Sequence, residues 1–145
     1  MPRAWAYFDT SALVKRYIRE PGSQRLRALL RRYRVISSAV MPVEALSAFS
    51  RRHAIGDLTV RDFQAIIAQI GKDRAHWDLV EVTSEVLFRA EDLVRRTSLR
   101  TLDAIHVASV LTIEQAAGLR FAFVTADAVQ RDAAAGLSLD LVWLE

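Results

Sequence analysis

The pattern of apolar and polar residues along the chain predicts short strands that alternate with amphipathic helices. Short runs rich in apolar residues predict strands at residues 4–8, 35–36, 78–82, 121–124 and 139–143. Between them, apolar residues recur every three or four positions, which predicts a helix beginning at Ser23, a helix between residues 38 and 52, and helices at residues 11–19, 59–69, 84–94, 102–117 and 127–135. Such alternation is typical of a mainly parallel sheet with right-handed crossovers and helices on both faces. We therefore expect one α/β domain spanning residues 1–145, interrupted between residues 39 and 74 by a helical insertion.

Residues at the predicted helix ends indicate where the helices begin and stop. Ser84 and Thr101 are expected to cap the helices that follow them, because a Ser or Thr hydroxyl accepts a hydrogen bond from a free N–H group of the first turn. For the helix near residue 40 two frames are open, with Ser38 as its N-cap or with Pro42 at its first position. Gly118 is expected to end the long helix before it, which is apolar around its circumference and is therefore predicted to be central.

The composition excludes several classes of protein. The chain has no cysteine, which excludes a disulfide framework and a thiolate metal site. It has no apolar run suited to a signal peptide or to a membrane span of about 20 residues. We therefore expect a cytoplasmic protein that does not associate with membranes.

The net charge of +3 conceals an uneven distribution of charge. Residues 1–72 contain 13 Lys or Arg against 5 Asp or Glu, whereas residues 73–145 contain 7 against 12. A basic surface attracts nucleic acid because Lys and Arg neutralise phosphates, and the candidate RNA-binding residues are Arg16, Arg19, Arg51 and Arg52. The alternative is that these arginines form an ordinary solvent-exposed face. The chain uses Arg in preference to Lys throughout, since Lys15 and Lys72 are its only two lysines.

Four acidic residues follow predicted strands or begin predicted helices. Asp9 and Asp127 follow the strands at residues 4–8 and 121–124, while Glu44 and Asp103 lie near helix starts. Each has a structural interpretation: Asp is a common N-cap, and a carboxylate in the first turn is stabilised by the helix dipole by about 0.3–1 kcal/mol. If the two strands are neighbours, however, all four acids can meet at one edge of the sheet. Two carboxylates 4 Å apart repel by about 4 kcal/mol at an effective dielectric near 20, so such a cluster needs a cation.

The donor types favour a hard cation. Oxygen ligands without His or Cys suit Mg²⁺ or Mn²⁺, whereas His53, His76 and His106 show no paired spacing for zinc. His106 lies on nearly the same helix face as Asp103, and its interpretations are a core histidine, which we favour, or a ligand or base. Ser11 and Thr125 are accessory candidates, because a hydroxyl beside a metal-bound carboxylate can orient it; ordinary capping is the alternative.

Four sequence fragments resemble the PIN-domain nucleases, and within them the VapC-type toxins of type II toxin–antitoxin pairs. The fragments are Tyr7-Phe-Asp9-Thr-Ser11-Ala-Leu-Val-Lys15, Val43-Glu44-Ala-Leu, Leu99-Arg-Thr-Leu-Asp103-Ala-Ile-His106-Val-Ala108 and Val124-Thr125-Ala-Asp127. They occur in the family's order, and the resemblance covers almost the whole chain.

The resemblance implies a three-layer α/β/α fold and an endoribonuclease that depends on Mg²⁺ or Mn²⁺. Carried over by position, Asp9, Glu44, Asp103 and Asp127 would be the catalytic and metal-binding residues. It also implies an RNA substrate, a homodimer and a cognate antitoxin. The sequence departs from many relatives at the position immediately after Asp127, where they carry a basic residue and this chain carries Ala128.

Two other functions remain open at this point. A PIN module could bind nucleic acid or regulate without catalysis, using the Arg-rich first half alone, although the four acids argue against this. A PIN nuclease could instead act in RNA processing or on DNA.

Overall fold

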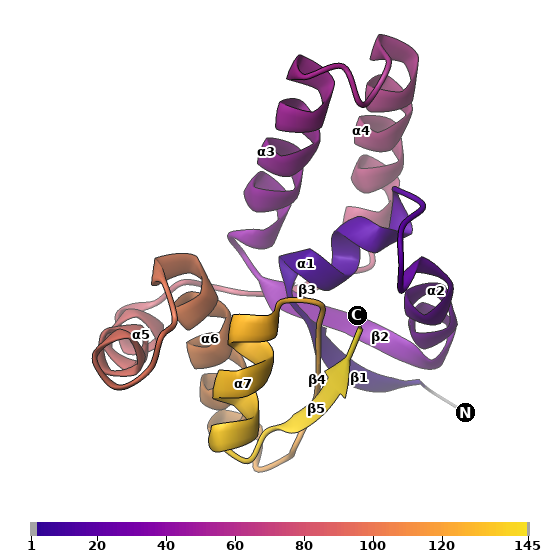
Figure 1. The fold of residues 1–145 in the computed structure, drawn as a ribbon. Helices are drawn as coiled ribbons and strands as arrows, with labels where there is room; N and C mark the ends of the chain where they lie inside the picture. Colours follow the sequence, from indigo (N-terminus) through magenta and orange to yellow (C-terminus); the bar gives the residue numbers. More distant parts are fainter. Residues whose placement is uncertain (1–2, 145) are drawn as a thin grey trace.

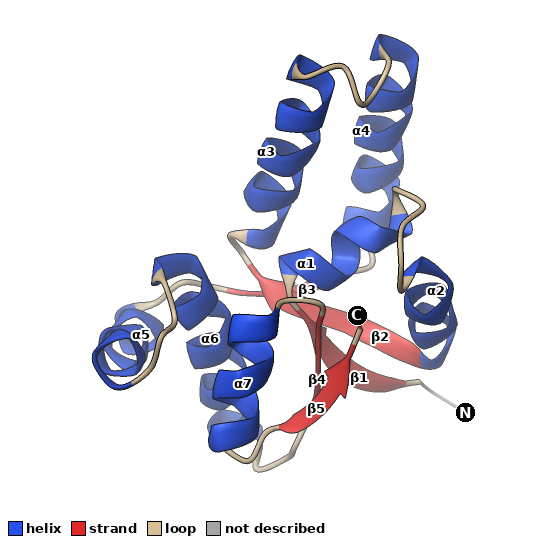
Figure 2. Cartoon of the chain, in the orientation of Figure 1, coloured by secondary structure: helices blue, strands red, loops and turns tan. Residues whose placement is uncertain are grey.

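Parallel strands form the central sheet of the protein, whose computed structural model describes residues 3–144. The strands lie in the order β3-β2-β1-β4-β5, and in that order they span Asp78–Val80, Tyr33–Ser38, Ala4–Phe8, Ala122–Thr125 and Asp140–Trp143. All neighbouring pairs are parallel (Figure 2). The expected parallel sheet is confirmed, with β1 at its centre.

Helices cover the two faces of this sheet in separate groups (Figure 1). One group comprises α1 (Thr10–Leu13), the 3₁₀ helix η1 (Val14–Arg16), α2 (Ser23–Arg32), α3 (Met41–Ala54) and α4 (Val60–Arg74). The other comprises α5 (Ser84–Arg96), α6 (Thr101–Ala117) and α7 (Ala128–Gly136). Side chains of β1 alternate between them: Ala6 and Phe8 pack in the core beneath the first group, and Tyr7 packs in the core beneath the second. The three-layer α/β/α architecture is therefore confirmed.

The helical insertion forms a hairpin, α3 and α4, that extends away from the sheet (Figure 1). Asp73 near the end of α4 ties the hairpin to the segment after β1, because it accepts hydrogen bonds from Arg16 Nε and the Tyr17 hydroxyl, each at 2.6 Å. Arg52 on α3 pairs with Glu20 at 3.2 Å. Arg16 and Arg52 are thus engaged in holding the hairpin in place.

The single helix expected at residues 11–19 is wrong. α1 ends at Leu13, and the chain tightens into η1 before it turns. The buried Lys15 ammonium group donates to the carbonyl of Pro21 at 2.6 Å and to Glu20 at 3.2 Å. These contacts fold the segment back on itself, and Gly22 at φ +89° completes the turn in a conformation that suits glycine.

Two predicted N-caps are off by one residue. Thr83, not Ser84, caps α5, because the backbone of Thr83 is extended and its hydroxyl accepts the N–H of Val86 at 3.2 Å. Thr101 is the first residue of α6 rather than its cap, since Arg100 occupies the cap position without a side-chain hydrogen bond. Neighbouring residues can compete for a cap position, and the backbone conformation decides between them.

Neither predicted frame for α3 is correct in full. The helix begins at Met41, so that Pro42 lies at its second position, while the Ser38 hydroxyl accepts the N–H of Val40 at 3.2 Å. The central position of α6 is confirmed by its run of buried residues, and Gly118 ends it in the left-handed conformation at φ +65°. Among residues 3–144, no helix is long and apolar enough to cross a membrane.

Candidate active site

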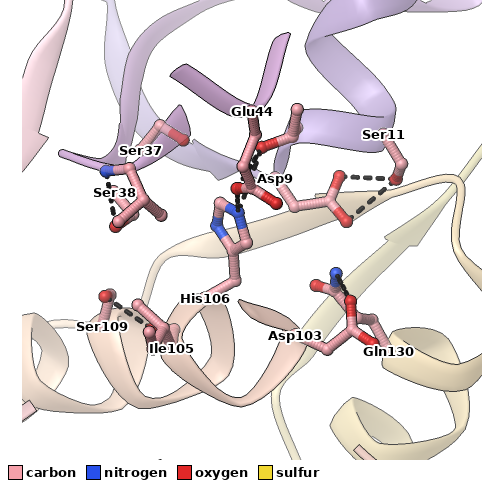
Figure 3. Close-up of polar contacts among 12 residues, drawn as sticks. Asp9, Ser11, Ser37, Ser38, Glu44, Asp103, Ile105, His106, Ser109 and Gln130 are labelled. Atoms are coloured by element: carbon pink, nitrogen blue, oxygen red, sulfur yellow. Dashed lines mark hydrogen bonds and ion pairs between the residues drawn. The ribbon is translucent and has the colours of Figure 1, made fainter. Parts of the chain in front are cut away.

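The carboxyl ends of β1 and β4 carry two of the predicted acids side by side. Asp9 directly follows β1 and donates its backbone N–H to the Val124 carbonyl at 3.1 Å, which continues the parallel pairing of the two strands. Asp127 follows β4 and precedes α7. Glu44 and Asp103 enter the same region from the first turns of α3 and α6 (Figure 3). The structure therefore places all four acids at the edge of the sheet where open α/β proteins bind ligands.

Asp9 is fully buried and accepts several hydrogen bonds. The Thr125 hydroxyl donates at 2.6 Å, the Ser11 hydroxyl contacts both carboxylate oxygens at 2.8 and 2.9 Å, and the Ala12 N–H donates at 2.9 Å as the cap of α1. Burial raises the pKa of Asp9, although the electrostatic effect of His106 and these donors oppose the rise. Asp9 is thus the cap of α1 as well as a candidate site residue, and the two accessory candidates, Ser11 and Thr125, donate hydrogen bonds to it.

Asp127 is joined to Asp9 through one hydroxyl. The backbone N–H of Asp127 donates to Thr125 Oγ1 at 3.0 Å, and that hydroxyl donates to Asp9. The carboxylate of Asp127 caps α7 by accepting the backbone N–H of Gln130 at 2.9 Å. The N-cap interpretation of Asp127 is therefore correct as well.

Asp103 is held by a side chain of α7. Gln130 Nε2 donates to Asp103 Oδ1 at 2.9 Å. Burial raises the pKa of Asp103 above its ordinary value, the negative charge of Asp127 adds to the rise, and the Gln130 hydrogen bond opposes it. The two carboxylates therefore lie close enough to repel each other.

Glu44 ends a chain of hydrogen bonds that begins in the core. The hydroxyl of Tyr7 lies 2.7 Å from His106 Nδ1, and His106 Nε2 lies 2.7 Å from Glu44 Oε1. Thr10 also donates to Glu44 at 2.7 Å. Burial raises the pKa of Glu44, but His106 and Thr10 outweigh it, so the pKa is lowered overall. His106 is buried, as favoured from the sequence, and it also orients a site carboxylate.

Asp127 is linked to Asp9 through Thr125 and to Asp103 through Gln130, whereas Glu44 is held by His106 and Thr10. Within residues 3–144, no three His, Cys, Asp or Glu side chains are grouped closely enough to hold a metal ion. A Mg²⁺ ion typically binds one or two protein carboxylates and keeps several waters. The neighbouring Asp103 and Asp127, with a buried amide oxygen of Gln130 that has no hydrogen-bond partner in the described structure, fit such an ion.

Two adjoining surface hollows open beside Glu44. One, of about 350 Å³, is lined by Glu44, Asp103 and Arg100, and the other, of about 320 Å³, is lined by Glu44, Arg51 and residues of α3. Leu102 lines both hollows. Glu44 and Asp103 are therefore reachable from solvent, and each hollow has one arginine in its lining.

The four candidate RNA-binding arginines are dispersed. Arg51 lines a hollow with Glu44, whereas Arg16 and Arg52 pair with acids that tie the hairpin, and Arg19 is exposed. Arg16 also borders a larger hollow of about 600 Å³, away from the four acids, whose other arginines are Arg3, Arg27, Arg31 and Arg34. The structure brings one of the four beside the acidic site.

Three further residues contact the acids or His106, and their roles were missed by sequence reasoning. Thr10 and Tyr7 lie near Asp9 in the sequence, but only the fold shows that Thr10 contacts Glu44 and that Tyr7 contacts His106. Gln130 had a signal, because a Gln three residues after an N-cap is the pattern of a capping box.

Comparisons with known proteins agree with this geometry. The chain matches the PIN domain model over residues 6–136. It is 34% identical over 137 residues to Ribonuclease VapC46 of Mycobacterium tuberculosis (strain ATCC 25618 / H37Rv), a match that covers 94% of this chain and 95% of that protein.

Solved structures share the fold at lower sequence identity. The structure of VapBC2 from Rickettsia felis, bound to a DNA fragment from their promoter, superposes with a TM-score of 0.66 and 10% identity, over 97% of this chain and 98% of that chain. A toxin–antitoxin complex from Klebsiella pneumoniae gives a TM-score of 0.64 and 16% identity, over 94% and 95%. These likenesses show the fold alone. The family model and the relative in M. tuberculosis, each matched over most of the chain, show that the chain belongs to the PIN domain family.

Proposed function

We propose that this protein is an endoribonuclease that depends on Mg²⁺ or Mn²⁺ and serves as the toxin of a type II toxin–antitoxin pair. The observation that carries the proposal is the placement of Asp9, Glu44, Asp103 and Asp127 at one edge of the sheet, where Glu44 and Asp103 line an open hollow. The name of the M. tuberculosis relative as a ribonuclease supports the reaction, and the toxin–antitoxin complexes among the structural neighbours support the biological role.

The proposed metal-binding residues are Asp103 and Asp127, with Asp9 and Glu44 completing the acidic surface around them. When bound there, a divalent cation supplies a Lewis acid that lowers the pKa of a water molecule and offsets negative charge on the phosphate. The side chains of the protein position the groups around this cation. Thr125 and Ser11 fix the direction of the Asp9 carboxylate.

The chain also keeps Glu44 ionised. A carboxylate only accepts hydrogen bonds, so His106 Nε2 carries the hydrogen at the 2.7 Å contact with Glu44, and Thr10 donates a second one. Both donors lower the pKa of Glu44 against the opposing effect of burial. An ionised Glu44 beside the solvent-exposed hollow can accept a proton from an attacking water.

The arginines beside the hollows supply the proposed RNA contacts. Arg51 lines one of the two hollows and Arg100 the other, and Glu44 and Leu102 line both. Guanidinium groups bind phosphates through paired N–H donors, so an RNA strand lying in the hollows can be held by an arginine in each.

Arg51→Gln is expected to weaken RNA binding several-fold and to reduce the salt dependence of the affinity by roughly one phosphate contact. Fluorescence anisotropy of labelled RNA at several salt concentrations measures both quantities. Arg31→Gln is the matched control, because Arg31 lines the larger basic hollow away from the acids. Weaker binding by the Arg31 variant, with unchanged binding by the Arg51 variant, would place the RNA in that larger hollow.

We further propose that the protein forms a homodimer, binds a cognate antitoxin and acts in the cytoplasm. Val43 and Leu102 are 65% and 45% exposed, respectively, and both line the hollow next to Glu44. Exposed apolar side chains in one place favour a protein interface. A protein bound to Val43 and Leu102 would lie beside the acidic site.

The direct test of the proposed function is RNA cleavage by the purified protein. We expect RNA fragments with Mg²⁺ or Mn²⁺ and intact RNA when a chelator is present, because the acids alone repel the phosphate. Single-stranded DNA of the same sequence serves as the control substrate. Salt-dependent RNA binding without cleavage at any divalent ion would support the noncatalytic module instead, and preferential cleavage of DNA would support a DNA nuclease.

A further inference from the structure

Gln130 connects two of the acids at once. Its backbone N–H donates to Asp127 Oδ1 at 2.9 Å, and its side-chain Nε2 donates to Asp103 Oδ1 at 2.9 Å. The two acids belong to different elements, the start of α6 and the residue before α7. One residue therefore holds two carboxylates side by side although their charges repel.

The orientation of the Gln130 amide follows from this contact. A carboxylate can only accept a hydrogen bond, so the group that faces Asp103 must be the NH₂ of the amide. The opposite orientation would bring two acceptor oxygens together at 2.9 Å. The amide oxygen, Oε1, is consequently directed away from Asp103.

Unlike Nε2, Oε1 has no hydrogen-bond partner among the described residues. Gln130 is 4% exposed, and Oε1 is a buried acceptor without a hydrogen bond to any described residue. A buried acceptor without a hydrogen bond lowers the stability of a protein by about 1–3 kcal/mol. An apolar side chain at this position of α7 would avoid that loss. In Figure 3 the amide lies beside Asp103, on the side of the site where Asp9 and His106 are drawn. The unmatched oxygen is thus part of the acidic site.

We propose that Gln130 is a positioning residue of the metal site: its N–H groups fix Asp103 and Asp127 as a pair, and its Oε1 accepts a hydrogen bond from the hydration shell of the bound ion. The inference rests on the proposed function, because it concerns the ion that this function requires. Residues that orient metal ligands typically change metal affinity by about 10–100-fold when they are replaced. Gln130 is expected to do so without touching the RNA.

The test is the dissociation constant for Mn²⁺, measured on the folded, RNA-free protein by the spin resonance of free Mn²⁺. Gln130→Met keeps the length of the side chain and the backbone N–H that donates to Asp127, but it removes the side-chain donor to Asp103 and the acceptor Oε1. We expect its dissociation constant to rise by about 10-fold or more, while the melting temperature of the metal-free protein stays within a few degrees of the wild type. Gln64→Met on the exposed surface of α4 is the matched control and should bind Mn²⁺ like the wild type.

The outcomes separate this inference from the function on which it rests. Unchanged Mn²⁺ affinity in folded Gln130→Met, with normal binding by the wild type, overturns the role of Gln130 and leaves the metal site standing. Failure of the wild type to bind Mn²⁺ overturns both.

A second variant decides the matter if the Met variant does not fold. Gln130→Glu keeps an acceptor oxygen but places a third carboxylate beside Asp103 and Asp127. Its metal-free form should melt below the wild type, and Mn²⁺ should raise its melting temperature by more than it raises that of the wild type. An equal or smaller rise overturns the inference.

Discussion

Asp103→Asn is expected to slow RNA cleavage by about 10³-fold while leaving the metal-free protein at least as stable as the wild type. Loss of a metal-binding carboxylate removes transition-state stabilisation of several kcal/mol, and about 4 kcal/mol corresponds to 10³ in rate. Stability should not fall, because burial and the charge of Asp127 raise the pKa of Asp103. A raised carboxyl pKa means that the charged form opposes folding at neutral pH. The Asn amide oxygen can still accept the Gln130 hydrogen bond.

Cleavage rates and thermal melts in chelator measure the two halves of this prediction. The gain in melting temperature over the wild type should shrink as the pH falls and should vanish below the ordinary pKa of Asp, where the wild-type carboxyl group is protonated in both states. Asp57→Asn, in the exposed loop between α3 and α4, is the control. A fall of several degrees for Asp103→Asn in chelator would show that Asp103 is a structural residue.

His106→Leu should destabilise the protein by about 2–4 kcal/mol, because it leaves the buried Tyr7 hydroxyl without its partner and removes the donor that holds Glu44. Cleavage should also fall in protein that remains folded. Urea unfolding gives the loss in free energy, and the comparison is made at a temperature where the variant is folded.

A double-mutant cycle with Tyr7→Phe separates the core contact from the site contact. Tyr7→Phe alone removes the hydroxyl that faces His106, so the double variant should lose less stability than the two single variants together, by about 1 kcal/mol. Cleavage in Tyr7→Phe should be affected far less than in His106→Leu, because Glu44 keeps its donor. Strict additivity of the two stability losses would refute the proposed link.

The edge of the sheet that carries the site was predictable from the sequence. Buried runs at β1 and β4 implied parallel strands, and the position of Asp9 and Asp127 just after them implied a shared edge. The positions of the helices could be predicted from the spacing of their apolar residues. The N-caps of α5 and α6 could not, because two neighbouring polar residues in each case suit the cap position equally well. The cap interpretation and the site interpretation do not exclude each other, since Asp9 and Asp127 are N-caps that also lie at the candidate site.

The contacts between elements were not predictable. Arg16 and Arg51 belong to similar basic stretches, yet one pairs with Asp73 and the other lines a hollow beside Glu44. Which arginine lies beside Glu44 depends on the directions in which α3 and α6 leave the sheet. The same directions bring His106 into contact with Glu44. These directions depend on packing between residues far apart in the chain, which leaves no local pattern.

The pairing of β1 with β4 also bears on the synthesis of the protein. The hydrogen bond from Thr125 to Asp9 joins residues 116 positions apart, and Asp9 cannot be held in place until β4 has been made. A nascent chain that stops short of β4 carries three of the four acids, but it lacks Thr125 and Gln130, which hold Asp9 and Asp103. Because domains tend to fold as units during translation, the ribosome that makes this nuclease is exposed to its assembled site only late in the process.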